Sequence, residues 1–140
     1  MRKNKNQSGP NFLSFLEKGI GLLVEKLFSK SSFAVLPHGE LSGRWQEIER
    51  MDPKLAVIEA DKLVDTVLRR AGLDGASMAD RIRKTEKMVS RPVYQSMWDA
   101  HKVRNELVHE VDRHVNEYSS RDAINKMKNY LEALGAFKND

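Results

Sequence analysis

Hydrophobic residues recur at three- and four-residue steps along most of the chain, a spacing that places them on one face of an α-helix. The clearest example follows Asp52 and Pro53, which are typical of a helix N-cap and first helical residue, and runs to Gly72, a typical stop. Its apolar positions are Val57, Ala60, Val64, Val67, Leu68 and Ala71. No run alternates between apolar and polar residues as a strand would. The pattern predicts an all-α protein, an antiparallel bundle of four to five helices over residues 44–136, preceded by an amphipathic helix.

Cap and turn residues mark the expected limits of the other helices. These are a short helix with Trp45, Ile48 and Met51, a polar helix from the Ser77–Asp80 capping box to about Val89, a helix over Val93–Glu110, and a last helix from the cap pair Ser119 and Asp122 to Gly135.

The N-terminal third divides into a basic, disordered tail over residues 1–10, an amphipathic helix over 11–33, and a linker over 34–43 rich in proline and glycine. The apolar stretch Phe12–Phe28 contains four charges and falls short of the roughly 20 uncharged residues that a spanning helix needs. It could lie on an anionic membrane surface, or pack on its own bundle or on a second copy. Packing is favoured because the polar face carries both signs of charge.

The net positive charge of the chain comes from this N-terminal segment. The chain has 140 residues and a net charge of +4, and residues 1–33 already supply all of it with six Lys or Arg against two Glu. The bundle is therefore neutral overall. There are no cysteines, so disulfides, thiolate metal sites and cysteine nucleophiles are excluded. This composition suits a cytoplasmic protein, with peripheral membrane contact through Phe12–Phe28 as the second possibility.

The helix expected over Val93–Glu110 carries the candidate chemistry. At about 100° per residue, its apolar side chains form one stripe, and Arg104, His101, Asn105 and His109 share a sector beside that stripe. The stripe consists of Met97, Ala100, Val103, Leu107 and Val108. Polar groups bordering a core need partners. They could form a structural network with neighbouring helices through Asp61 or Asp65, and Asp61 could reach inward from the edge of the apolar face of the helix that follows Pro53.

The same residue types suit a phosphodiester. Metal-free RNA cleavage uses the ribose 2′-hydroxyl as nucleophile and needs an acid, a base and a cation for the developing charge. Histidine titrates near neutrality and arginine matches phosphate geometry. His109 and His114 are five residues apart, about 140° on a helix, which is poor spacing for two metal ligands. We therefore expect neither a metal ion nor a cofactor.

The segment from Arg104 to His109 (Arg-Asn-Glu-Leu-Val-His) resembles the Arg-x4-His motif of HEPN domains, including the polar residue after the arginine. Its place late in a helix of a bundle of this size is similar too, and the resemblance covers residues 41–135. It implies a homodimeric helical protein, often a metal-independent endoribonuclease in toxin–antitoxin or RNA-processing systems.

Carried over to this chain, the resemblance gives Arg104 the scissile phosphate, Asn105 a supporting role and His109 the acid/base role. The helical spacing, and not the resemblance, adds His101 and Asp61 as supporting residues. The partners it implies are RNA and a second copy of the chain, while an antitoxin partner cannot be identified from the sequence. HEPN domains also include non-catalytic dimerisation modules and scaffolds, so that possibility stays open, as does nucleotide binding without cleavage.

Overall fold

A computed structural model describes residues 33–109 and 115–140. The predicted tail over 1–10 and nearly all of the predicted helix over 11–33 lie outside the described residues. The described part is entirely helical, as predicted, and its helices are α2 (Glu40–Arg50), α3 (Pro53–Arg70), α4 (Met78–Arg83), α5 (Arg91–His109) and α6 (Glu117–Ala133). None of these helices combines the length and apolar character needed to cross a membrane.

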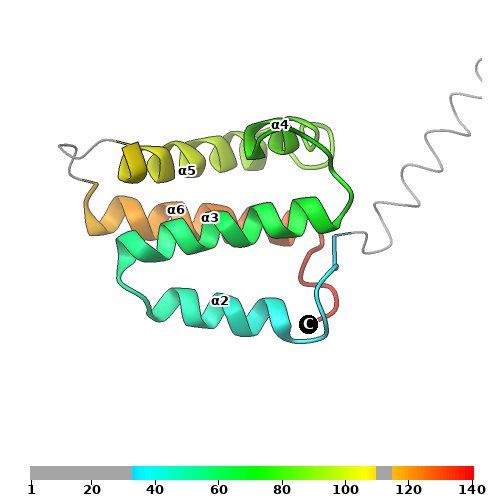
Figure 1. Ribbon diagram of the computed structural model, residues 1–140, viewed down its shortest axis with the longest axis horizontal. Helices are drawn as coiled ribbons and strands as arrows, with labels where there is room; N and C mark the ends of the chain where they lie inside the picture. The colour runs from blue at the N-terminus through cyan, green and yellow to red at the C-terminus, as the bar shows by residue number, and fades with distance from the viewer. Residues whose placement is uncertain (1–32, 110–114) are drawn as a thin grey trace, which may run out of the picture. The chain divides into compact units, whose positions relative to one another are not determined.

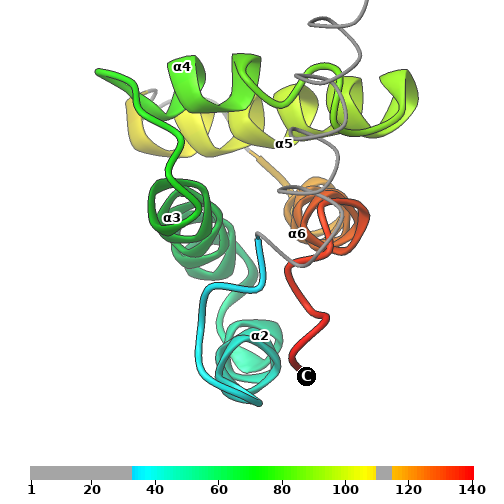
Figure 2. The ribbon, with the colours of Figure 1, turned by 90° about the vertical axis from the view of Figure 1, so that its right-hand side faces the viewer.

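Helices α3 and α6 form the middle of the bundle, with α2 on one side and α4 and α5 on the other (Figures 1 and 2). Consecutive long helices run in opposite directions, and Figure 2 shows α5 crossing α3 and α6 obliquely. The most extensive packing is that of α5 and α3 on α6. The largest fully buried side chains include Trp45, Leu68, Ile82, Met97 and Tyr130, so every described helix contributes to one core.

Local signals set the limits of α3 as predicted. The side chain of Asp52 accepts hydrogen bonds from the backbone N–H groups of Lys54 and Leu55, and Pro53 occupies the first helical position. Gly72 ends the helix with φ of 90°, a left-handed conformation that an L side chain rarely adopts. The predicted Ser77–Asp80 capping box at the start of α4 is also confirmed.

The expected linker over residues 34–43 is wrong in its second half, because α2 begins at Glu40 and contains Gly43. Phe33 and Leu36 are 1% and 5% exposed, so the preceding segment belongs to the core. The Asp140 carboxylate accepts hydrogen bonds of 2.8 Å from the backbone N–H groups of Gly39 and Ser42. The start of α2 is thus held by a residue about a hundred positions away.

Two other helix limits differ from the predictions. The polar helix ends at Arg83 rather than near Val89, because i→i+3 turns follow and the Thr85 hydroxyl donates to the Ile82 carbonyl. Helix α6 begins at Glu117, before the predicted Ser119 cap, because the Asn116 side chain caps it by accepting the Ser119 N–H at 2.7 Å.

Candidate functional site

A pocket of about 300 Å³ lies between α3, the start of α4 and α5. Four of the five predicted site residues line it: Asp61, His101, Arg104 and Asn105. Its other lining residues are Lys62, Asp65, Ser77, Met78 and Ala79. The pocket therefore brings together side chains from α3 and α5 whose proximity could not be read from either helix alone.

Asp61 is the buried centre of this pocket. It lies on α3 among apolar residues and is 3% exposed. Its Oδ1 accepts a hydrogen bond of 2.9 Å from His101 Nδ1, and its Oδ2 lies 3.4 Å from Arg104 Nε. Burial of a carboxylate is unfavourable without such partners. Asp61 therefore joins α3 to α5, as the structural-network interpretation predicts.

The guanidinium of Arg104 is held in place, and some of its N–H donors have no acceptor. Its side chain is 28% exposed, its Nε is buried without a hydrogen-bond acceptor, and its Nη1 donates to Asn105 Oδ1 at 3.1 Å. The contact with Asp61 is thus an ion pair at 3.4 Å without hydrogen-bond geometry. Because an arginine has five N–H donors, N–H groups on the Nη atoms remain for a ligand.

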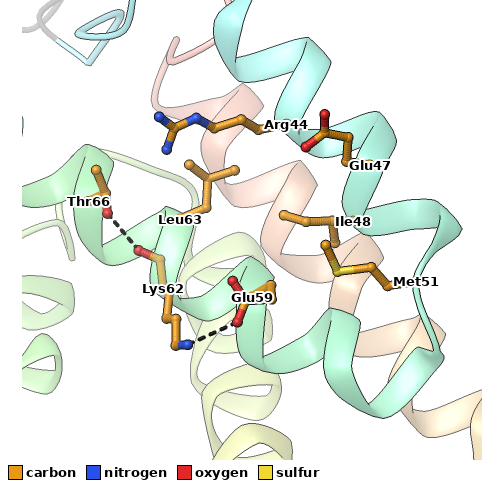
Figure 3. Close-up of a pocket in the computed structure, with 8 residues that line it drawn as sticks. All are labelled: Arg44, Glu47, Ile48, Met51, Glu59, Lys62, Leu63 and Thr66. Carbon is orange, nitrogen blue, oxygen red and sulfur yellow. Dashed lines mark hydrogen bonds and ion pairs between the residues drawn. The ribbon is translucent and has the colours of Figure 1, made fainter.

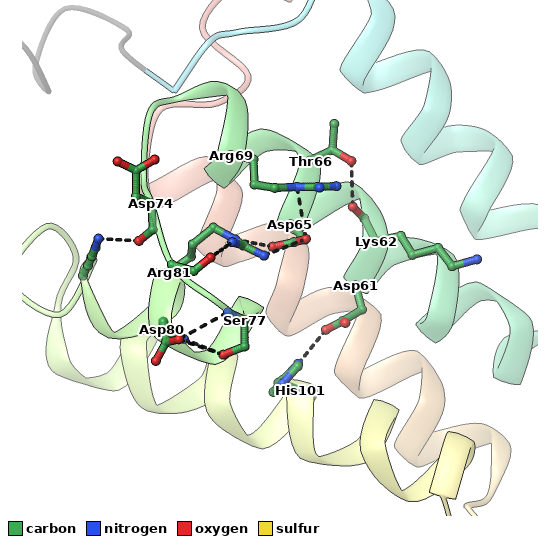
Figure 4. A network of polar contacts seen from close by, with 12 residues as sticks. Asp61, Lys62, Asp65, Thr66, Arg69, Asp74, Ser77, Asp80, Arg81 and His101 are labelled. Atoms are coloured by element: carbon green, nitrogen blue, oxygen red, sulfur yellow. Dashed lines mark hydrogen bonds and ion pairs between the residues drawn. The ribbon is translucent and has the colours of Figure 1, made fainter.

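The imidazole of His101 is oriented from two sides. Nδ1 faces the Asp61 carboxylate, so it carries the proton, and Nε2 is the nitrogen left to accept one (Figure 4). The ring also lies edge-on to Trp98, with centroids 6.2 Å apart. A carboxylate that fixes the tautomer of a histidine favours acid/base use of the other nitrogen.

The wall of the pocket formed by the α3–α4 connection is fixed by a second charged cluster (Figure 4). Arg81 is nearly buried and donates from Nε and Nη2 to the two carboxylate oxygens of Asp65, at 2.7 and 3.2 Å. Its Nη1 donates to the Gly75 carbonyl at 2.7 Å. Arg69 adds a longer ion pair to Asp65. These groups satisfy one another, so we assign them to support of the pocket rather than to ligand binding.

His109 lies outside this pocket. It is the last residue of α5, is exposed, and makes no hydrogen bond to the side chains that line the pocket. Its neighbour Val108 is 45% exposed, so the predicted apolar stripe is wrong at that position. Met97 and Ala100 of the stripe are buried, whereas Val103 and Leu107 are half-buried. One chain therefore does not bring His109 and Arg104 into one pocket.

A second pocket, of about 310 Å³, lies between α2 and α3 (Figure 3). Its floor is apolar, with Ile48, Met51 and Leu63, and its rim carries two acidic and two basic residues. Lys62 on this rim is paired with Glu59 at 2.9 Å. None of the predicted site residues lines this pocket, and the paired charges give it no excess of either sign.

Within the two described ranges, no three His, Asp or Glu side chains gather in a way that could hold a metal ion. The chemistry that the first pocket can perform with its own residues is anion binding by Arg104 and proton transfer by His101.

Comparisons with known proteins do not add to this description. No protein-family model matches the chain, and no curated protein or solved structure gives a significant match.

The structure adds residues to the site that the sequence did not single out. Lys62 and Ser77 line the pocket, from α3 and from the cap of α4. The capping pattern around Ser77 indicated a helix start, but which helix it faces depends on tertiary packing. Lys62 follows Asp61 directly, and the sequence indicated only that it lies on the outer face of α3, not that it lines a pocket with α5.

Proposed function

We propose that the protein is a metal-independent endoribonuclease of HEPN type, in which Arg104 binds the scissile phosphate and His109 transfers protons. The observation that carries this proposal is the pocket in which Arg104, Asn105 and His101 meet beside a buried carboxylate. A partly exposed guanidinium with free donors suits a phosphate. The reaction needs both an acid and a base, and His101, oriented by Asp61, is a second histidine that supports His109 in proton transfer.

The proposed reaction needs only groups of the protein and of RNA. A base removes the proton of the ribose 2′-hydroxyl, and the 2′-oxygen forms a bond to phosphorus. The bond from phosphorus to the 5′-oxygen of the next nucleotide breaks, and an acid protonates that oxygen. The products are a 2′,3′-cyclic phosphate and a 5′-hydroxyl. Arg104 stabilises the charge that develops on the phosphoryl oxygens.

The proposal includes a second copy of the chain, because His109 stands apart from the pocket. Three large hydrophobic residues are exposed in the described ranges: Leu55, Val108 and Tyr118. They lie at the start of α3, the end of α5 and the start of α6, which share one end of the bundle (Figure 1). An isologous contact at this end would cover apolar surface and bring His109 toward the partner's copy of the same helix.

The test measures cleavage of single-stranded RNA in excess EDTA together with thermal melting of each variant. We expect Arg104→Ala and His109→Ala to lower the rate by about 100-fold or more, the usual size of an acid/base or electrostatic contribution. His109→Ala should leave the melting temperature unchanged because the side chain is exposed. The matched control is Arg121→Ala, which removes a surface arginine that is 53% exposed and paired with Glu117. Full activity of the Arg104 and His109 variants would refute the assignment.

A second candidate is a non-catalytic HEPN-like dimerisation module, and the contacts of Asp61 favour it. A buried carboxylate that faces both His101 and Arg104 gives these residues a structural role without any substrate. On this proposal, wild-type protein does not cleave RNA, and Arg104→Ala lowers the melting temperature instead. The same set of measurements therefore separates the two candidates.

A further inference from the structure

An aromatic and cationic cluster lies on α5 beside the pocket. Trp98 is partly exposed, whereas Trp45, the other tryptophan, is 1% exposed. The rings of Tyr94 and His101 meet Trp98 edge-on, with centroids 6.1 and 6.2 Å away. The guanidinium carbon of Arg83, from the end of α4, lies 5.7 Å from the centroid of the Trp98 ring. An arginine plane facing an indole that reaches the surface is a possible stacking site.

The sector of α5 that carries this cluster contains no carboxylate. With Tyr94 at zero and about 100° per residue, the residues Trp98, His101, Asn105 and His109 fall within about 60° of it. The acidic residues of α5 nearest to the sector, Glu106 and Asp99, lie at about 120° and 140°. Two acidic groups of other helices near the sector are already engaged: Asp61 contacts His101 and Arg104, and Asp80 pairs with Arg83 at 2.7 Å.

The cluster is continuous with the pocket through His101, which contacts Trp98 on one side and Asp61 on the other. Trp98 and Arg104 are six residues apart, about 9 Å along the helix axis. A short stretch of single-stranded RNA covers that span. A phosphate at Arg104 would therefore place a neighbouring base near Trp98.

We propose that Trp98 and Arg83 bind an unpaired nucleobase of single-stranded RNA, inserted between the indole and the guanidinium, while a phosphate of the same strand is bound at Arg104. The inference rests on the proposed function for its RNA substrate. Single-stranded RNA is generally held by stacking of bases on aromatic rings and arginine planes, with cations along the backbone. Arg83 can move aside to admit the base, because its side chain is 62% exposed and its ion pair with Asp80 lies at the surface.

Base stacking tolerates any base, so the site would give affinity and position rather than a strict sequence preference. It would set which phosphate reaches Arg104 relative to an unpaired base. Double-stranded RNA, whose bases are already stacked, should therefore bind less well.

Binding is tested with a short single-stranded deoxythymidine oligonucleotide, which lacks the 2′-hydroxyl and cannot be cleaved by the proposed reaction. Titration into full-length protein should quench the fluorescence of Trp98, while buried Trp45 supplies a constant background. An abasic oligonucleotide of the same length should bind about tenfold more weakly, because stacking contributes about 1–3 kcal/mol per base.

Substitutions at Trp98 and Arg83 test whether the base binds between these two side chains. With a fluorescently labelled oligonucleotide, Trp98→Leu and Arg83→Ala should each weaken binding several-fold or more, and Trp98→Tyr should retain most of it. Arg121→Ala is the matched control for Arg83→Ala, since it removes an arginine that is 53% exposed and likewise paired with a carboxylate of its own helix. Arg83→Ala keeps the test decisive if Trp98→Leu does not fold, because Arg83 contributes little to the core.

Equal affinity for the thymidine and abasic oligonucleotides, or unchanged binding by the Arg83 and Trp98 variants, would overturn the inference while leaving RNA cleavage at Arg104 intact. Base-dependent binding without any RNA cleavage would support the inference and refute the proposed enzyme. The two failures are therefore distinguishable.

Discussion

Replacement of Asp61 is the perturbation that most clearly separates the structural from the chemical role of the site. The carboxylate is 3% exposed, accepts a hydrogen bond from His101 at 2.9 Å and faces Arg104 Nε at 3.4 Å. Removal of one partner from a buried charged pair costs about 3–5 kcal/mol. The lower end applies here, because Arg104 is 28% exposed and can turn toward water. We expect Asp61→Ala to lower the free energy of unfolding by about 3 kcal/mol and Asp61→Asn by about 2 kcal/mol.

For a domain of this size, 1 kcal/mol shifts the melting temperature by about 4–8 °C, so Asp61→Ala should melt roughly 15 °C below wild type. Thermal and urea unfolding followed by circular dichroism measure this effect. Arg121→Ala, which breaks a surface pair with 53% and 67% exposed partners, should change stability by less than about 0.5 kcal/mol.

A double-mutant cycle with Arg104→Ala assigns the effect to the pair. If Asp61 and Arg104 interact as the 3.4 Å separation indicates, removal of Arg104 from the Asp61→Ala variant should cost less than its removal from wild type, by about 1 kcal/mol. A melting temperature for Asp61→Ala within about 2 °C of wild type, or strictly additive effects, would show that Asp61 does not join α3 to α5.

Further outcomes concern three residues, Tyr130, Asp140 and Gly39. Tyr130→Phe should destabilise by about 1 kcal/mol in urea unfolding, because the buried Tyr130 hydroxyl donates to Thr85 Oγ1 at 2.7 Å while Thr85 itself donates to the Ile82 carbonyl. Burial raises the pKa of Tyr130 above its ordinary value of 10.0, against the opposing effect of the Thr85 hydrogen bond. Wild type should therefore lose stability as the pH rises above 10.0, and Tyr130→Phe should lack this pH-dependent loss of stability. Burial alone would raise the pKa of Asp140, but hydrogen bonds from Ser42 and Gly39 outweigh burial and lower the pKa below its ordinary value of 3.8. The stabilisation from this carboxylate is therefore present above pH 3.8 and is lost as the pH falls through the lower folded-state pKa. The difference in unfolding free energy between wild type and Asp140→Asn should accordingly disappear in acid. Gly39→Ala should destabilise by about 1 kcal/mol, since φ there is 75°; an unchanged urea midpoint would contradict the positive φ.

The sequence predicts those helix limits that local residues determine. Asp52, Pro53 and Gly72 lie within or next to α3, and each acts on the backbone within a few positions. The start of α2 was not predicted, because the residue that caps it, Asp140, lies about a hundred positions away in the sequence. A pattern of neighbouring residues cannot reveal that contact.

The candidate site was predictable to the same extent. Helical spacing places His101, Arg104 and Asn105 in one sector of α5, and these residues do line one pocket. Spacing could suggest Asp61 as their partner but could not establish it, because the approach of α3 to α5 depends on the whole core. The helical wheel also treats α5 as covered along its full length, whereas burial decreases toward its end: Met97 and Ala100 are buried and Val108 is 45% exposed.

The central proposal is that this site cleaves RNA through the ribose 2′-hydroxyl, and the most direct measurement compares two versions of one labelled single-stranded oligonucleotide in excess EDTA. One version is all RNA, and the other is fully 2′-deoxy with the same sequence. We predict that wild-type protein cuts only the RNA version, that the fragments carry 2′,3′-cyclic phosphate and 5′-hydroxyl ends, and that Arg104→Ala cuts neither. Intact RNA after incubation with folded wild-type protein, or equal cleavage of both versions, would contradict the proposal.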